Sequence, residues 1–210
     1  MATPHKPNPS LRRTGLFSGS QLALSSLNGA NYHLTRIKQI LDEAERVWWS
    51  APDFEDSQFL ASRDVNEVLW HLRSFFWELI GVFDLMLQWA NEHFQLGLSE
   101  DQVKWNTIRQ AQPKSNNPTW METRRVLREA WDSAWCFDVR TYRNFSHRSF
   151  LHLTTLIPRQ PGKIIVAMEA ARDNAPMCAD IRDELPKYVE AVRVLGGKVF
   201  LPSDDPENAV

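Results

Sequence analysis

Three side chains suited to acid–base and phosphate chemistry share one predicted helical face in the run DVRTYRNFSHRSF. Arg140, Arg143 and His147 stand at positions i, i+3 and i+7, with Asn144 and Arg148 beside them. That spacing puts the three on the same side of an α-helix. A histidine in the last turn meets the negative end of the helix dipole, which favours its protonated form, and two guanidiniums next to it can hold a phosphate. An imidazole that moves protons and an arginine that stabilises phosphorane charge are the groups that metal-free RNA cleavage requires.

The segment that carries these side chains, residues 119–148, has helical periodicity along its whole length. Its apolar face comprises Trp120, Leu127, Ala130, Trp131, Ala134, Trp135, Tyr142 and Phe145. Its opposite face comprises Glu122, Arg125, Glu129, Asp132, Arg140, Arg143 and His147. Pro118 stops whatever precedes it, and Thr119 with Glu122 forms a capping box. We therefore predict one amphipathic helix of about eight turns, packed through its aromatic face against other helices.

Asp138 is an exception on that aromatic face, where Trp131 and Tyr142 flank it. A buried carboxylate needs a hydrogen-bond partner. We expect Asp138 to accept a hydrogen bond from an arginine, a tryptophan or a backbone N–H, and to have a structural role.

The rest of the chain supplies the elements that must hold this helix in place. Helical or strand periodicity predicts helices at 31–50, 57–94, 99–110 and 175–199, and two hairpin strands at 151–157 and 163–168. A bend is expected near Gly81 and a kink or restart at Pro186. Residues 1–26 and 201–210 have no periodicity, which predicts a disordered N-terminal arm and a loose acidic tail.

These elements predict a mainly α fold, a bundle of four to five helices (two of them long) with an appended β-hairpin at about 151–168. A single helical-bundle domain covers residues 27–200. Nine tryptophans and the apolar lengths of the two long helices favour a further buried surface between two copies, so we expect a homodimer.

A helical bundle whose late helix carries an arginine, a small polar residue and then a histidine four to six residues beyond the arginine resembles the HEPN superfamily. The resemblance covers residues 31–152 and rests on Arg140, Arg143, Asn144 and His147. It implies either a metal-independent endoribonuclease that assembles its site across a dimer or an inactive relative, in a toxin–antitoxin or defence setting. RNA and a protein antitoxin are the implied partners, and no cofactor or metal is implied.

Carried over by position, the resemblance makes His147 the general acid or base, with Asn144 and Arg148 contacting the substrate. Arg140, with six residues between it and His147, takes the role of the motif arginine. Arg143 is the alternative, because it is followed by the polar Asn144 but has only three residues before His147. The sequence leaves both registers open.

An interpretation without chemistry also stays open. Arg140 and Arg143 can form ion pairs with Glu129, Asp132 or the second helix, while His147 caps the helix end. The protein would then be a non-catalytic helical-bundle interaction or dimerisation protein.

Composition excludes several other classes. A net charge of −2 and a pI of about 6.3 disfavour a non-specific nucleic-acid coat. Cys136 and Cys178 form no CxxC pair, which suits a reducing cytoplasm, and the most apolar run, 75–90, carries two acidic residues and is too short to span a bilayer. We therefore expect a cytoplasmic protein with no membrane partner. No glycine-rich phosphate loop, HExxH motif or serine elbow occurs, and Glu67 with His71 lacks the second half of a metal site.

Overall fold

The computed structural model describes residues 19–50, 59–113, 117–148, 151–169 and 179–200, without the side chains of residues 62, 147, 148 and 169. Within these ranges the chain is mainly α-helical with one two-stranded β-hairpin, which confirms the predicted fold class. None of the helices in the described ranges is both long enough and apolar enough for a membrane crossing.

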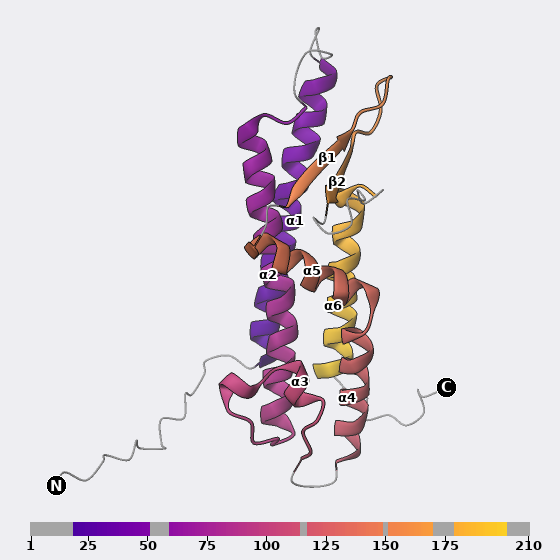
Figure 1. Cartoon of the computed structure of the whole chain (residues 1–210). Coiled ribbons are helices and arrows are strands. Elements are labelled where there is room, and N and C mark those ends of the chain that lie inside the picture. The colour runs from indigo at the N-terminus through magenta and orange to yellow at the C-terminus, as the bar shows by residue number, and fades with distance from the viewer. Residues whose placement is uncertain (1–18, 51–58, 114–116, 149–150, 170–178, 201–210) are drawn as a thin grey trace, which may run out of the picture.

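The bundle is built on two long helices that lie side by side along the molecule, α1 (Gly19–Ser50) and α2 (Ser62–His93) (Figure 1). A third helix, α6 (Ile181–Phe200), packs against both of them. The large side chains that fill the space between these helices recur every three or four positions, as amphipathic helices require. Those with less than 2% of their surface exposed include Ile37, Leu41, Leu72, Phe75, Phe76, Leu79, Met86 and Leu87.

Helix α1 begins at Gly19, so the prediction that the N-terminal arm extends to residue 26 is wrong. Residues 1–18 lie outside the described ranges. The segment from 19 to 30 is rich in small residues and lacks an obvious apolar stripe, but Ala23 and Ala30 are buried. A Cβ on Gly29 would lie 2.9 Å from Cδ of Glu78, so only glycine allows this approach of α1 to α2 without a shift of that side chain. Small side chains are what let this part of α1 pack closely.

Helix α2 runs without interruption through Gly81, whose backbone remains helical. It ends where Gln95 and Gly97 adopt positive φ angles of 52° and 76°. The short helix predicted at 99–110 is instead two pieces, a 3₁₀ turn η2 (Glu100–Gln102) and a single α-helical turn α3 (Trp105–Ile108). Ser99 and Gln102 form a capping box at the start of the first piece.

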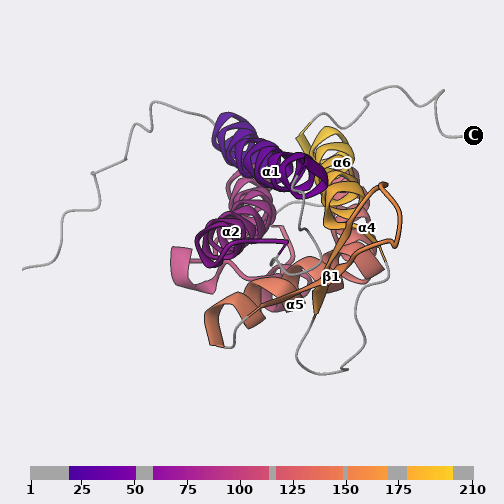
Figure 2. The same cartoon turned by 90° about the horizontal axis from the view of Figure 1, so that it is seen from above.

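The predicted single helix at 119–148 is wrong, because the chain turns between α4 (Pro118–Trp131) and α5 (Ala134–Arg148). Helix α4 lies along α6, whereas α5 turns away and crosses α2 (Figures 1 and 2). The main-chain N–H and the hydroxyl of Ser133 both donate to the Ala130 carbonyl oxygen, at 3.2 and 2.5 Å. A serine that bonds the preceding turn in this way ends the helix, and the turn lets the two halves bury their faces against different partners.

The start of α4 also differs from the prediction. Asn117 is the N-cap, and its side chain accepts a hydrogen bond from the Trp120 N–H at 3.3 Å, while Pro118 occupies the first helical position. Thr119 already lies inside the helix, so it cannot form the predicted capping box with Glu122. Proline at the first helical position is favourable because its missing N–H would have had no partner there.

The β-hairpin is confirmed as predicted. Strands β1 (His152–Leu156) and β2 (Ile165–Glu169) are antiparallel, with Leu156 opposite Ile165. Val166 and Met168 are fully buried, and β2 packs against α6. Helix α6 starts at Ile181 rather than near 175 and continues through Pro186; residues 170–178 lie outside the described ranges.

A buried ion cluster joins the hairpin, α1 and α6. The side chain of Arg182 is 8% exposed and bonds Asp180, Asp42 and Glu45 as well as the Ile164 carbonyl oxygen. Burial disfavours its charge, but the carboxylates outweigh burial and raise the pKa of Arg182. Sequence periodicity gives no sign of this cluster, since Asp42 and Glu45 lie more than a hundred residues from Arg182 in the chain.

Candidate functional site at the crossing of α2 and α5

Arg140 is held by the corner between α4 and α5. Its Nη2 donates to the Trp131 carbonyl oxygen at 3.1 Å, and its Nε donates to the Cys136 carbonyl oxygen at 3.2 Å. The guanidinium carbon lies 3.7 Å from the centroid of the Trp131 ring. Carbonyls at a helix C-terminus carry partial negative charge, so the cation is well placed to cap α4. Arg140 therefore has a structural explanation that needs no ligand.

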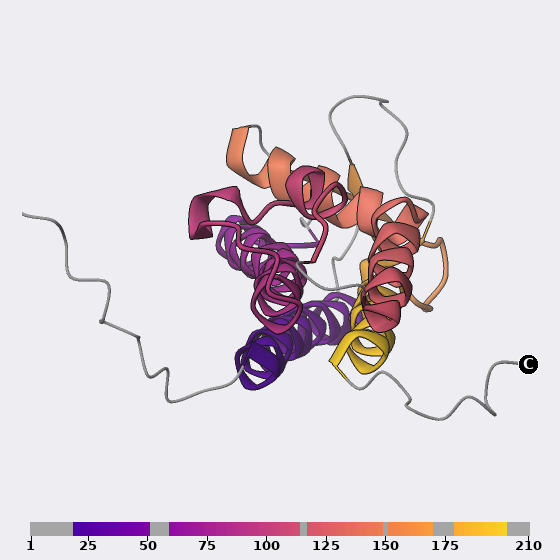
Figure 3. The ribbon, with the colours of Figure 1, turned by 90° about the horizontal axis from the view of Figure 1, so that it is seen from below.

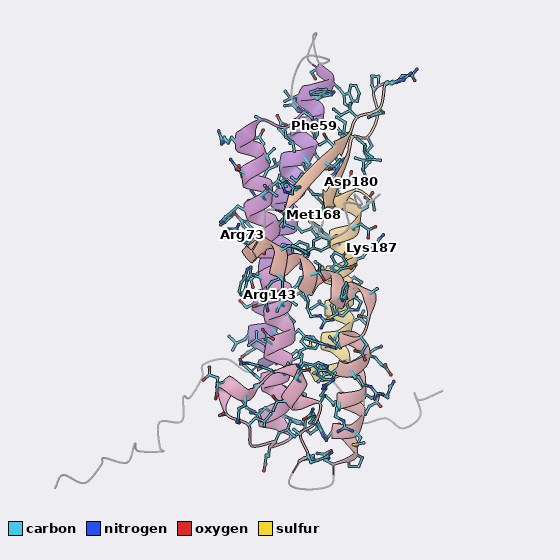
Figure 4. The ribbon with its side chains drawn as sticks, viewed as in Figure 1. Phe59, Arg73, Arg143, Met168, Asp180 and Lys187 are labelled. Carbon is cyan, nitrogen blue, oxygen red and sulfur yellow. The ribbon has the colours of Figure 1, made fainter. Side chains whose placement is uncertain are left out.

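Arg143, one turn further along α5, has a different environment. Its guanidinium carbon lies 5.0 Å from the centroid of the Trp77 ring on α2. Its Nε is buried and has no hydrogen-bond partner among the described residues. The positive charge of Arg143 also acts on Asp84 of α2. Surrounding protein atoms raise the pKa of the Asp84 carboxyl, and the nearby Arg143 guanidinium opposes that rise. Figure 4 shows Arg143 and Arg73 on the same side of the molecule, where the end of α5 crosses α2.

The remaining predicted site residues follow Arg143 in the last turns of α5. Asn144 is exposed, and the backbones of His147 and Arg148 complete the helix. The side chains of His147 and Arg148 lie outside the described set. The three predicted residues whose side chains are described thus divide in two, with Arg140 at the α4–α5 corner and Arg143, followed by the exposed Asn144, at the α2 crossing.

Sequence reasoning missed the α2 side of this crossing. Trp70 and Trp77 are 57% and 41% exposed, and the exposed Arg73 lies between them at i, i+3 and i+7. Arg140, Arg143 and His147 on α5 have the same spacing. The sequence alone does not single out the α2 residues, because tryptophans in a long apolar helix are usually core residues. Exposed indoles and guanidiniums on one surface are typical of sites that stack bases and hold phosphates.

Asp138 is half-buried and accepts a hydrogen bond from the Tyr188 hydroxyl on α6 at 3.3 Å. Burial raises the pKa of Asp138, the Tyr188 hydrogen bond opposes the rise, and Glu184 adds to it. The donor is a tyrosine rather than the predicted arginine, tryptophan or backbone N–H. The contact ties α5 to α6 and so supports a structural role.

Other potential chemical groups are buried. Cys136 is buried, and burial raises the pKa of its thiol to about 11, which leaves little thiolate at neutral pH. His71 lies 3.9 Å from Glu67 and, through Nδ1, 2.8 Å from Nδ1 of His33 on α1. In the part of the chain that the structure describes, no three histidine, cysteine or acidic side chains gather as metal ligands.

Fold and site together describe a mainly α bundle with a cationic and aromatic surface where α5 crosses α2. Comparison with known proteins adds nothing to this description, since no family model, curated protein or solved structure matches the chain. The functional argument therefore depends on the residues of this chain alone.

Proposed function

We propose that the protein is a HEPN-like protein that acts on RNA at the crossing of α2 and α5, with Arg143 rather than Arg140 as the motif arginine. The observation that supports this register is the contrast between the two side chains. Arg140 bonds two main-chain carbonyl oxygens, whereas the guanidinium of Arg143 stands over the exposed Trp77 and donates no hydrogen bond to the described residues, with its Nε itself buried. An arginine with unused donors is the one that can bind a phosphate.

In this proposal His147, four residues after Arg143 and so one turn along α5, is the general acid or base. It removes a proton from the 2′-hydroxyl or returns one to the leaving oxygen, and the helix C-terminus favours the protonated imidazole that the second step needs. Arg143 stabilises the charge on the phosphorane, and Asn144 and Arg148 contact neighbouring phosphates or sugars. Trp70 and Trp77 supply faces on which unpaired bases stack. No metal takes part.

The biological setting that goes with this proposal is a toxin–antitoxin or defence system, in which a protein antitoxin covers the crossing. The active unit is a homodimer in which two copies of the α5 end face each other. This arrangement would supply two histidines and two arginines to one RNA strand, which a single copy does not do.

The second candidate is a non-catalytic interaction or dimerisation protein. The observation in its favour is the set of large exposed aromatic side chains, which includes Phe137 on α5, 61% exposed, as well as Trp70 and Trp77. Exposed aromatic residues of this size are enriched in protein–protein interfaces. On this view, Arg143 is an interface residue.

A metal-free cleavage assay separates the two candidates. The full chain is incubated in EDTA with a panel of structured and single-stranded RNAs, together with His147→Ala, Arg143→Ala and the conservative corner variant Arg140→Lys. A surface substitution on α6, Arg193→Ala, serves as the control. Cleavage that is lost in the His147 and Arg143 variants and kept in the Arg140 and Arg193 variants supports the proposal. Cleavage that is insensitive to His147→Ala, or absent from the wild type on every RNA, rules out the catalytic form.

A further inference from the structure

A second cationic site lies between α3 and α4, at the end of the bundle seen in Figure 3. The structure has an open cavity there with a volume of about 730 Å³. Among the described residues, four arginines line it, Arg109 after α3 and Arg124, Arg125 and Arg128 on α4, together with one acidic side chain, Glu122. We call this cavity the arginine pocket.

The arginine pocket is positively charged, whereas the whole chain is negatively charged. Its lining carries a net charge of +3, while the full sequence has a net charge of −2. Glu122 is already engaged by Arg125, which also pairs with Glu129. Arg109, Arg124 and Arg128 have no carboxylate within 4.0 Å among the described residues. Like charges held around one cavity repel each other, and a bound anion removes that repulsion.

One of these cations is held by a hydrogen bond to the main chain. Arg124 donates through Nη1 to the Arg109 carbonyl oxygen at 3.4 Å, which ties the middle of α4 to the C-cap residue of α3. Trp105 forms an apolar wall and is itself fixed against Trp131, with ring centroids 5.9 Å apart. Pro118, the first residue of α4, also lines the pocket, so the positive end of that helix dipole adds to the local field.

We propose that the arginine pocket binds the di- or triphosphate of a nucleotide, either free or at the 5′ end of an RNA. A guanidinium can bind phosphate through two parallel N–H···O hydrogen bonds. Three arginines without carboxylate partners therefore match a polyphosphate better than they match a single carboxylate or a chloride ion. The cavity falls within the size range of small-molecule sites, and its apolar wall and the exposed Met121 at its edge leave room for a base or sugar. The pocket uses none of the residues at the α2–α5 crossing, so this proposal goes beyond the proposed function.

Isothermal titration calorimetry on the full chain at low salt tests the proposal, with ATP, inorganic pyrophosphate and adenosine as probes. ATP and pyrophosphate should bind and adenosine should not. The double variant Arg109→Gln, Arg128→Gln should weaken ATP binding by about tenfold or more, because it removes two exposed cations without disturbing the core. The matched control is Arg46→Gln, an exposed arginine on α1. Binding that is absent at millimolar ATP and pyrophosphate, or that is unchanged in the double variant, overturns the proposal.

A second binding experiment shows whether the pocket takes the phosphates of a free nucleotide or those at the 5′ end of an RNA. Tighter binding of a 5′-triphosphate RNA oligonucleotide than of its 5′-hydroxyl counterpart, lost in the double variant, assigns the pocket to an RNA end. Binding of ATP with no preference between the two oligonucleotides assigns it to a free nucleotide. His147→Ala and Arg143→Ala should leave ATP binding unchanged in either case, so failure of the proposed ribonuclease activity and failure of this pocket are distinguishable.

Discussion

Arg140 stacks on Trp131 at 3.7 Å while donating a hydrogen bond to that residue's carbonyl oxygen, so one side chain fixes both the ring and the backbone at the end of α4. The same side chain bonds the Cys136 carbonyl oxygen in the first turn of α5. The two Trp131 contacts span the corner that replaces the predicted continuous helix, whereas the Cys136 bond lies within α5. The residue that looked most like a catalytic arginine is therefore the one that the fold uses to join two helices.

The first prediction concerns the stability of this corner. Arg140→Ala removes two hydrogen bonds and a cation–π contact, and the free energy of unfolding should fall by about 2 kcal/mol. Arg140→Lys should recover only part of that loss, because an ammonium cannot stack as a guanidinium does. Urea unfolding followed by circular dichroism measures both. The exposed variant Arg193→Ala is the control and should unfold like the wild type. An Arg140→Ala protein as stable as that control would contradict the assignment.

The second prediction separates the observed start of α4 from the expected one. Asn117→Ala should lower the free energy of unfolding by about 1 kcal/mol, because the Trp120 N–H loses its side-chain acceptor and keeps only the main-chain oxygen of residue 117, at 3.1 Å. Thr119→Ala, which removes the residue that the sequence pattern favoured as the cap, should change stability by less than about 0.5 kcal/mol. Thermal and urea unfolding of the two variants side by side gives the answer. A larger effect for Thr119 than for Asn117 would mean that the helix begins later than described.

The differences between sequence and structure have specific physical causes. Periodicity correctly predicted α2, the hairpin, the second half of α1 and most of α6, because each of these elements buries one continuous face. Periodicity did not predict the break at Asp132 and Ser133. A helical wheel averages over the whole segment, so it cannot show that the two halves of the segment pack against different helices. It failed at Gly19 because a close-packed helix of small residues has no apolar stripe to detect.

The candidate site was predictable only in part. The i, i+3, i+7 spacing identified α5, but Arg140 and Arg143 lie three residues apart and spacing alone cannot choose between them. Their tertiary neighbours differ: Arg140 lies over Trp131, and Arg143 lies over Trp77. Neither contact is visible in the sequence. The arginine pocket was missed because Arg109 belongs to a different element from Arg124 and Arg128 and comes next to them only in the fold.

The third prediction tests the buried ion cluster. Arg182→Met should lower the free energy of unfolding by about 3–5 kcal/mol, because it leaves Asp180, whose side chain is 3% exposed, with only the more distant and exposed Lys163, at 3.7 Å, as a cation. The double variant Arg182→Met, Asp180→Asn should recover part of the loss, since it removes the buried charge as well. Lys163→Met, which affects the exposed edge of the same cluster, should have a small effect. If the double variant is no more stable than Arg182→Met, uncompensated charge is not the cause.

The fourth prediction concerns pH and rests on the His33–His71 pair between α1 and α2. The two Nδ1 atoms are 2.8 Å apart, so one must donate and the other accept. Glu67 near Nε2 of His71 favours a proton there, which makes His33 the donor. Burial lowers the pKa of His33, with Glu78 opposing. Burial and then His33 lower the pKa of His71, with Glu67 opposing and Arg36 lowering it further.

The sign of the effect follows from these shifts. In the unfolded chain both imidazoles bind protons near about pH 6.5, whereas in the folded protein they do so only at lower pH. The unfolded state therefore binds more protons as the pH falls below neutral, and the free energy of unfolding should decrease from about pH 7.5 to about pH 5. The variant His33→Gln, His71→Gln keeps a polar pair without titration and should show a flatter profile. His93→Gln, an exposed histidine on α2, is the control and should keep the wild-type slope. Urea unfolding at a series of pH values measures all three, and a double variant with the wild-type slope would show that other groups cause the acid sensitivity.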